Sequence, residues 1–196
     1  MKLLYSALFL FVTCFHLLAQ YEPKVKERTF DVEIVDGVCS FHGIKIGDKL
    51  EDVNAKFGET PLTSKTTDKR GSFVTMYYPD YGLEFTFEGE YVRVILLYPQ
   101  RGSVMGDIEK FKIYSRNTNT WRFKDMSING AQPQDIITAM GAESINTKLG
   151  SGFTSAISNN VMGYKLINSG GSQDMIFYFL NTKENVIEHI ANRLSE

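Results

Sequence analysis

Hydrophobic and polar side chains alternate with a period of two in several short stretches of the chain. Residues 30–35 alternate in this way, Asp36-Gly37 is typical of a hairpin turn, and residues 38–46 continue as a second strand. The pattern predicts that one face of this hairpin is buried. Further strands are predicted over residues 73–78, 83–87, 91–98, 111–114, 121–128, 153–157, 163–167 and 175–180.

A seven-residue pattern occurs twice, with its copies 83 residues apart. Residues 52–58 and 135–141 both contain an acidic residue, an aliphatic residue, three variable positions, a large apolar residue and a glycine. Val53 and Phe57 are one turn apart on the same face of a helix, and Gly58 is typical of a helix end. The repeat therefore predicts a short helix in each half of the chain.

The end of the chain has a different pattern. Asn181 and Glu184 have the spacing of a helix-capping pair, and Val186, Ile190 and Leu194 follow at helical intervals. This segment predicts an additional helix that closes the chain.

Each half therefore has the pattern of a hairpin, a short helix and three antiparallel strands. We expect an α+β fold of two tandem similar modules with a C-terminal helix, in which the modules share or abut one antiparallel sheet. The predicted boundaries are a signal peptide at 1–19, a first module at 20–98, a linker at 99–110 and a second module at 111–196.

The first 19 residues are typical of a cleaved export signal. Lys2 supplies the positive start, residues 3–18 are almost wholly apolar, and Ala19 is a small residue before the cleavage point. An uncleaved anchor is the alternative, but the run is shorter than the roughly 20 residues that a membrane span needs. A lipoprotein would need acylation of Cys14, whose preceding residues do not form the small-residue box of lipoproteins. We therefore expect a periplasmic or secreted protein without a stable membrane span after cleavage.

The net charge limits the kinds of partner to expect, and the cysteine content limits how the fold can be stabilised. The whole chain has a net charge of −2, and loss of Lys2 with the signal changes this to −3. A nearly balanced charge argues against nucleic acid as a partner. Cys39 is the one cysteine outside the signal, so the mature domain has no intrachain disulfide and relies on its core.

The sequence offers few reactive groups for an enzyme. His42 and His189 are the histidines outside the signal, and neither has the spacing of a metal site. His42 lies at a predicted bulge and His189 on the predicted C-terminal helix, so structural or surface roles fit both. Cys39 is a candidate nucleophile because His42 is near in sequence, but its apolar neighbours favour a small core residue. We therefore expect no catalytic residue, no cofactor, no metal and no enzymatic activity.

Three carboxylates, Glu84, Glu88 and Glu90, lie on one predicted hairpin. They are candidates for a weak calcium site, and the alternative is that they form the solvated face of the sheet. We favour the solvated face.

Aromatic side chains are the most abundant candidate binding groups in the sequence. Tyr77, Tyr78, Tyr81 and Tyr91 cluster on one predicted hairpin system, and Trp121 lies on a strand of the second half. Tyrosine and tryptophan often anchor interfaces because they bury much area with few rotatable bonds. These five residues are the predicted partner-binding side chains, and the alternative is that they cover the hydrophobic edge of the sheet.

Residues 41–98, and less clearly residues 123–180, resemble a superfamily of exported proteins. That superfamily is shared by the secreted β-lactamase-inhibitor proteins and the small outer-membrane lipoproteins of the barrel-assembly machinery. The chain also resembles exported two-module immunity and inhibitor proteins, which implies that its function is to hold another protein. It differs from the inhibitors in lacking their disulfides and from the lipoproteins in lacking an acylated cysteine. The resembling segments are residues 43–48, 50–53, 57–58, 77–78, 82–85 and 92–97.

The sequence thus predicts an exported, non-enzymatic module that binds another protein, as an inhibitor or immunity-type factor. One alternative is a structural or assembly factor of the cell envelope or surface. Another is a carrier of a small molecule or lipid, which would need an apolar cavity between sheet and helices.

Overall fold

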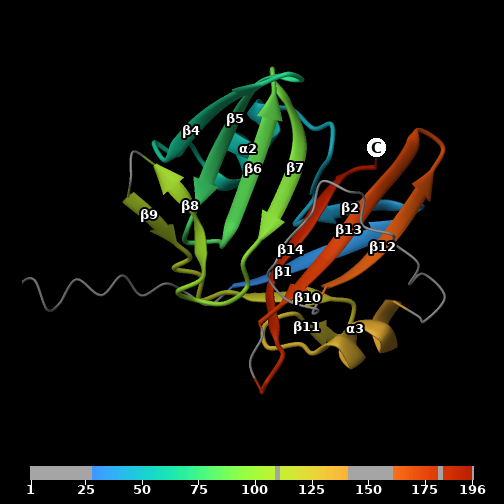
Figure 1. Cartoon of the computed structure of the whole chain (residues 1–196). Coiled ribbons are helices and arrows are strands. Elements are labelled where there is room, and N and C mark those ends of the chain that lie inside the picture. Colours follow the sequence, from blue (N-terminus) through green and yellow to red (C-terminus); the bar gives the residue numbers. More distant parts are fainter. Residues whose placement is uncertain (1–27, 109–110, 141–160, 181–182, 196) are drawn as a thin grey trace, which may run out of the picture.

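The computed structural model describes residues 28–108, 111–140, 161–180 and 183–195 of the chain. The predicted signal peptide and the predicted strand at 153–157 lie outside these ranges. Strands arranged in three sheets make up most of the described residues, with two short helices (Figure 1). The expectation of an α+β fold with two tandem modules and a C-terminal helix is therefore wrong, because the protein is mostly β.

The first sheet, sheet A, has the order β11 (Met126–Ser127), β10 (Thr120–Phe123), β1 (Thr29–Val35), β2 (Val38–Phe41) and β3 (Ile44–Lys45). The predicted β1–β2 hairpin is confirmed, and Asp36 and Gly37 in its turn have φ angles of 50° and 72°. Two positive φ angles are what a type I′ turn requires. β1 also pairs in parallel with β10, with Thr29 opposite Thr120. Sheet A therefore joins strands from the two halves of the sequence.

The second sheet, sheet B, has the order β12 (Val161–Asn168), β13 (Gly171–Phe179), β14 (Ile187–Leu194), β7 (Tyr91–Leu97), β6 (Leu83–Glu88), β5 (Gly71–Tyr78) and β4 (Thr63–Asp68). All neighbouring strands in it are antiparallel. β14 pairs with β7, and Ile190 lies opposite Leu97. This pairing joins the late strands of the chain to the early ones in one continuous sheet.

β14 replaces the predicted C-terminal helix. Its backbone pairs with β13 on one side and with β7 on the other, and Ile187 and Ile190 are fully buried. The helical spacing of apolar residues from Val186 to Leu194 is overridden because this segment fills a gap in the middle of the sheet. Asn181, the predicted cap, lies outside the described residues.

The two helices are α2 (Leu50–Phe57) and α3 (Pro133–Met140). They confirm the two short helices predicted from the repeat. Val53 and Phe57 are the buried residues of α2, which ends at Gly58 with φ of 82°. α3 buries Ile136 in the equivalent position. In the part of the chain that the structure describes, no helix has the length and apolar character needed to cross a membrane.

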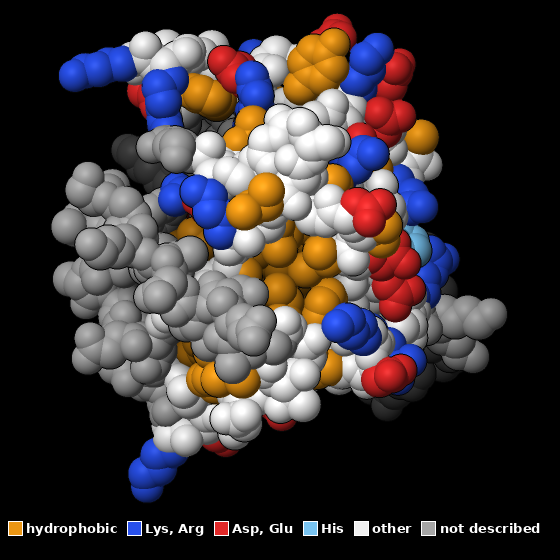
Figure 2. Space-filling model, turned by 90° about the vertical axis from the view of Figure 1, so that its right-hand side faces the viewer, with side chains coloured by type: hydrophobic (Ala, Val, Ile, Leu, Met, Phe, Trp, Pro, Cys, Tyr) orange, Lys and Arg blue, Asp and Glu red, His pale blue; other side chains and the backbone are white. Residues whose placement is uncertain are grey.

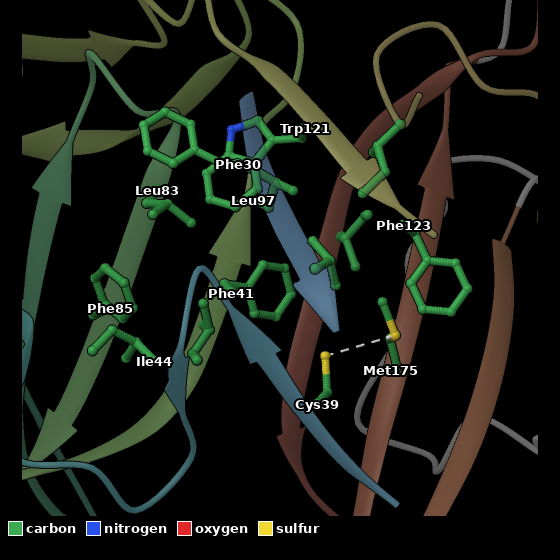
Figure 3. Packing of buried hydrophobic residues seen from close by; sticks show 14 of the residues in the cluster. Phe30, Cys39, Phe41, Ile44, Leu83, Phe85, Leu97, Trp121, Phe123 and Met175 are labelled. Atoms are coloured by element: carbon green, nitrogen blue, oxygen red, sulfur yellow. Dashed lines mark hydrogen bonds between the residues drawn. The ribbon is translucent and has the colours of Figure 1, made fainter. Parts of the chain in front are cut away.

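The main hydrophobic core lies between sheet A and one face of sheet B. Figure 3 shows Phe30, Phe41 and Trp121 of sheet A facing Leu83, Phe85 and Leu97 of sheet B. Cys39 is fully buried there, and its Sγ lies 4.0 Å from Met175 Sδ. Burial raises the pKa of the Cys39 thiol. The preference for Cys39 as a small core residue is confirmed.

Candidate functional site

The third sheet is a separate hairpin that packs against sheet B. Its strands are β8 (Val104–Ile108) and β9 (Phe111–Tyr114), and Figure 1 shows the pair beside the β4–β7 part of sheet B. Backbone hydrogen bonds of 2.8 Å from Gly102 N–H to Ser115 O and from Ser115 N–H to Ser103 O close its open end. β8 lies within residues 99–110, which the sequence analysis predicts as a linker. Part of the predicted linker is therefore a strand of this hairpin.

The inner side of the hairpin covers the face of sheet B that points away from the main core, which we call the second face. Met105 and Ile113 of the hairpin pack there with Tyr77 and Tyr98, and all four side chains are buried. A Cβ atom added at Gly106 would lie 2.6 Å from the Tyr77 ring, so no side chain fits between them. The hairpin and sheet B are thus in close contact at this glycine.

A carboxyl group is buried beneath this hairpin. Glu84 of β6 lies opposite Tyr77 in the sheet and is only 8% exposed. Burial raises the pKa of Glu84 to about 7, against a smaller lowering by its hydrogen bond with Tyr98. The Tyr98 hydroxyl lies 3.4 Å from Glu84 Oε2 and 3.2 Å from the carbonyl oxygen of Met105. One tyrosine therefore connects the carboxyl group of sheet B to the backbone of β8.

A histidine lies beside the same tyrosine. The His189 ring of β14 stacks between Tyr178, at 4.2 Å between ring centroids, and Tyr98, at 5.3 Å. Burial lowers the pKa of His189 to about 4, so the ring is neutral near pH 7. The sequence analysis placed His189 on a solvated helix, but the residue lies in a strand and its side chain is 23% exposed.

The sequence analysis did not identify Glu84, Tyr98 and His189 as a cluster. Glu84 was expected on a solvated face, because its cover comes from β8, which was not predicted. The available signal was residues 91–98, which are apolar on both faces and therefore indicate a strand that is covered on both sides.

Three of the five predicted partner-binding residues lie in or against the main core. Tyr78 and Trp121 are buried, and Tyr81 is half-buried. The ring of Tyr81 lies 5.0 Å from the ring of Phe57 and 5.6 Å from that of Phe30. Its carbonyl oxygen accepts a 3.1 Å hydrogen bond from Trp121 Nε1–H. The contacts of these three residues are those of core side chains.

The structure separates the other two predicted residues from these three. Tyr77 lies beneath the hairpin, where its hydroxyl forms a 3.1 Å hydrogen bond with the Ser64 hydroxyl. Tyr91 begins β7 and is 49% exposed. Among the five, Tyr91 therefore offers the most accessible ring, and the structure does not bring the set together as one patch.

The hairpin has exposed apolar side chains near both of its ends, with charged residues between them. Val104 is 48% exposed, Tyr114 is 50% exposed, and the two lie directly opposite each other on β8 and β9. Phe111, at the other end of β9, is 77% exposed and shares a face of the strand with Ile113, not with Tyr114. Asp107 and Lys112 form the cross-strand pair between these two apolar ends. We call these five residues the hairpin surface.

The remaining candidates from the sequence lie apart from this site. His42 is in a turn with φ of 51°, not in a bulge, and burial together with Lys56 lowers its pKa. Glu88 forms an ion pair with Arg93, and Glu90 is exposed. Within the described ranges, no group of three or more His, Cys, Asp or Glu side chains is placed to hold a metal ion.

An open depression lies beside the N-terminus of α2. Two of the backbone N–H groups there are already bonded, since Asp48 Oδ2 accepts the Lys45 N–H and Asp52 Oδ2 accepts the Lys49 N–H, both at 2.9 Å. The Asp48 and Asp52 carboxylates therefore occupy backbone N–H donors that a bound anion would need. The depression is lined by Gly43, Ile44, Lys45, Asp48, Asp52, Ala55 and Lys56.

Another apolar area lies on the face seen in Figure 2, on the side of the molecule where Figure 1 places β12 and β2. Hydrophobic side chains gather in the middle of this face and lie recessed between polar side chains. This face differs from the hairpin surface, where the exposed apolar side chains project from two strands.

Comparison with known proteins gives one distant structural likeness. No protein-family model matches the chain, and a search of curated proteins found no match. Among solved structures, the chain is similar to a DUF4309 family protein (YjgB) from Bacillus subtilis, with a TM-score of 0.43 and 15% sequence identity. The likeness covers 81% of this chain and 88% of that one.

Proposed function

We propose that the chain is an exported, non-enzymatic protein-binding module of the inhibitor or immunity type, and that it holds its partner with the hairpin surface. The observation that carries this proposal is the gathering of exposed apolar side chains on β8 and β9. Val104, Phe111 and Tyr114 are three of the seven large hydrophobic side chains that are exposed among the described residues. Exposed apolar groups with polar neighbours are typical of protein interaction sites.

The form of the hairpin supports the same proposal. β8 and β9 make a two-stranded sheet of their own, so among the described residues no third strand completes the edges of the pair. A partner strand can add to such an edge through backbone hydrogen bonds, while side-chain contacts supply specificity. The edge strand β4 of sheet B carries only threonine, serine, lysine and aspartate, which discourages this kind of pairing. The contrast favours β9 over β4 as the edge used for binding.

The inhibitor or immunity type is supported by the resemblance of residues 41–98 to exported proteins that hold another protein. Export is supported by the pattern of residues 1–19. The chemistry expected of the partner is an apolar patch, or an extended strand with apolar side chains, flanked by charges that match Asp107 and Lys112.

The test is site-specific photocrosslinking in the native envelope and secreted fractions. A photoreactive phenylalanine analogue replaces Phe111 in one variant and Ile167 in another. Ile167 is the matched control because it is 74% exposed but lies on β12. We expect one protein to be crosslinked from position 111 and not from position 167. A Val104→Ser and Tyr114→Ser double substitution should weaken this crosslink about tenfold or more, since each residue is an exposed anchor.

Two results would overturn the proposal. One is equal crosslinking from positions 111 and 167, which would mean that the hairpin surface has no special role. The other is the absence of any crosslinked protein in both fractions, because a binding module of this type has a stoichiometric partner.

A carrier of a small molecule or lipid is the second candidate function. It is favoured by the recessed apolar side chains on the face shown in Figure 2. Native mass spectrometry of the chain purified without detergent tests it. An added mass that persists on the folded protein and disappears on unfolding supports the carrier, and a bare protein mass excludes it.

A further inference from the structure

The hairpin that carries the proposed binding surface is attached to sheet B through one acid and one tyrosine. We propose that a proton on Glu84 fastens the β8–β9 hairpin to sheet B, and that loss of this proton loosens the hairpin. The inference rests on the proposed function for its biological meaning, since it would make partner binding depend on pH. The fastening itself concerns only the chain.

The Tyr98 hydroxyl has fewer hydrogens to donate than it has acceptors within reach. The Tyr98 hydroxyl has one hydrogen, and two acceptors lie within reach, Glu84 Oε2 at 3.4 Å and Met105 O at 3.2 Å. It can donate to only one of them at a time. When Glu84 is protonated, its own hydroxyl can donate to Tyr98 Oη, and the Tyr98 hydrogen is then free for Met105. The chain of bonds from Glu84 to β8 is complete in this state.

The ionised state breaks this chain. A carboxylate only accepts hydrogen bonds, so Glu84 then competes with Met105 O for the single Tyr98 hydrogen. The bond to the charged acceptor is the stronger one, which leaves the Met105 carbonyl without this donor. A charge is also held beneath the hairpin with water largely excluded. Both effects favour a state in which the hairpin lifts and water reaches the carboxylate.

The groups that surround Glu84 do not compensate its charge. Tyr77 faces it from β5 and Tyr98 from β7, and on β8 Asp107 is near enough to act on Tyr77. On β14, Glu188 is near enough to act on Tyr98, and His189 is neutral near pH 7. In the part of the chain that is described, no salt bridge involves Glu84. Lys112 is paired across the hairpin with Asp107, and Arg193 of β14 pairs with Asp174 at 3.8 Å. Burial is therefore the main influence on the pKa of Glu84, and it favours the protonated form.

The close contact at Gly106 makes the fastening sensitive. The backbone of β8 lies against the Tyr77 ring with no room for an added methyl group. A strand held this closely leaves no space for a water molecule between Gly106 and Tyr77, which lies opposite Glu84 in the sheet. The hairpin is thus either packed on sheet B or displaced from it.

The test measures how fast a thiol under the hairpin reacts with a soluble thiol reagent. Ile113→Cys places the thiol on the buried side of β9, and Val104→Cys places one on the exposed side of β8. The native Cys39, in the main core, reports opening of the whole protein. Peptide mass spectrometry follows each cysteine separately in the purified chain. Dividing the rate at position 113 by the rate at position 104 removes the pH dependence of thiol reactivity itself.

We expect this ratio to rise about tenfold or more between pH 5.5 and pH 8.5, while Cys39 stays unreactive. Glu84→Gln in the same background should keep the ratio low and flat, because the amide can donate to Tyr98 but cannot ionise. The proposal is overturned if the parent ratio does not change with pH, or if it changes equally in Glu84→Gln. It is also overturned if Cys39 becomes reactive over the same pH range, since the whole protein would then be opening.

A second variant tests the tyrosine in the link. Tyr98→Phe removes the hydroxyl and should raise the ratio already at pH 5.5, and an unchanged ratio at that pH would exclude Tyr98 as the connection. None of these measurements needs a partner. Failure to crosslink a protein would therefore reject the proposed function and leave the fastening intact, and a flat thiol ratio would do the reverse.

Discussion

Glu84 and His189 lie on the same face of sheet B, and their contributions to the free energy of unfolding change with pH in opposite directions. The pKa of Glu84 rises from an ordinary 4.5 to about 7, so its contribution to stability is present below pH 4.5 and is lost as pH rises through 7. The pKa of His189 falls from 6.5 to about 4, so its contribution is present above pH 6.5 and is lost as pH falls through 4. Each shift corresponds to about 3 kcal/mol. The pH-dependent changes in the two contributions therefore largely cancel each other between about pH 4.5 and 6.5.

Single substitutions should reveal these two slopes. In Glu84→Gln the histidine acts alone, so the free energy of unfolding should rise by about 2 kcal/mol between pH 4.5 and 7. In His189→Phe, which keeps a ring between Tyr98 and Tyr178, it should fall by about 2 kcal/mol over the same range. Urea unfolding at several pH values, followed by the fluorescence of the single buried Trp121, measures both. Two flat profiles would show that neither side chain carries the shift assigned to it.

At the scale of elements, local pattern was sufficient where an element is stabilised by its own neighbours. The β1–β2 hairpin has its turn residues at Asp36 and Gly37, and α2 has its apolar pair and its terminal glycine within eight residues. β14 was assigned wrongly because its apolar spacing also fits a helix. What makes it a strand is pairing with β13 and β7, which no local pattern contains.

The candidate site was missed for the same reason. β8 has Gly106 in its middle and turn-forming residues before it, so its sequence is typical of a connection. Glu84 lies between the apolar residues Leu83 and Phe85, and its exposure was inferred from that alternation alone. Its burial depends on a hairpin that begins about 20 residues later in the chain. Residues 91–98 indicated a second covered face, but they did not indicate what covers it.

The contact at Gly106 gives a prediction for the hairpin as an element. Gly106→Ala places a methyl group within 3 Å of the Tyr77 ring, so β8 must move away from sheet B. We expect proteolytic cleavage in the hairpin to become about tenfold faster at pH 5.5 without loss of the main core. Gly170→Ala is the control, because its nearest neighbouring atom is 3.4 Å away on the Asn168 side chain. Equal cleavage of both variants and the parent would show that the hairpin tolerates the methyl group in place.

At the scale of the whole molecule, both large sheets contain strands from both halves of the sequence. β1 pairs with β10 and β7 pairs with β14, so neither half contains a complete sheet. We predict that residues 28–98 and residues 111–195, produced separately, show no cooperative unfolding transition. Far-UV circular dichroism during a urea titration measures this, with the full chain as the control. A cooperative transition in either fragment would mean that one half closes its own core.

The pairing of β7 with β14 also determines when the protein can be complete. A chain made from its N-terminus has β7 available early, but the strand that pairs with its open edge begins only at Ile187, 90 residues after Leu97. Until then β7 offers unpaired backbone groups beside Ile95 and Leu97, which attracts proteases and other unfolded chains. A product that terminates before Ile187 stays in this vulnerable state permanently. β7 therefore stays a vulnerable edge throughout synthesis of the residues that separate it from β14.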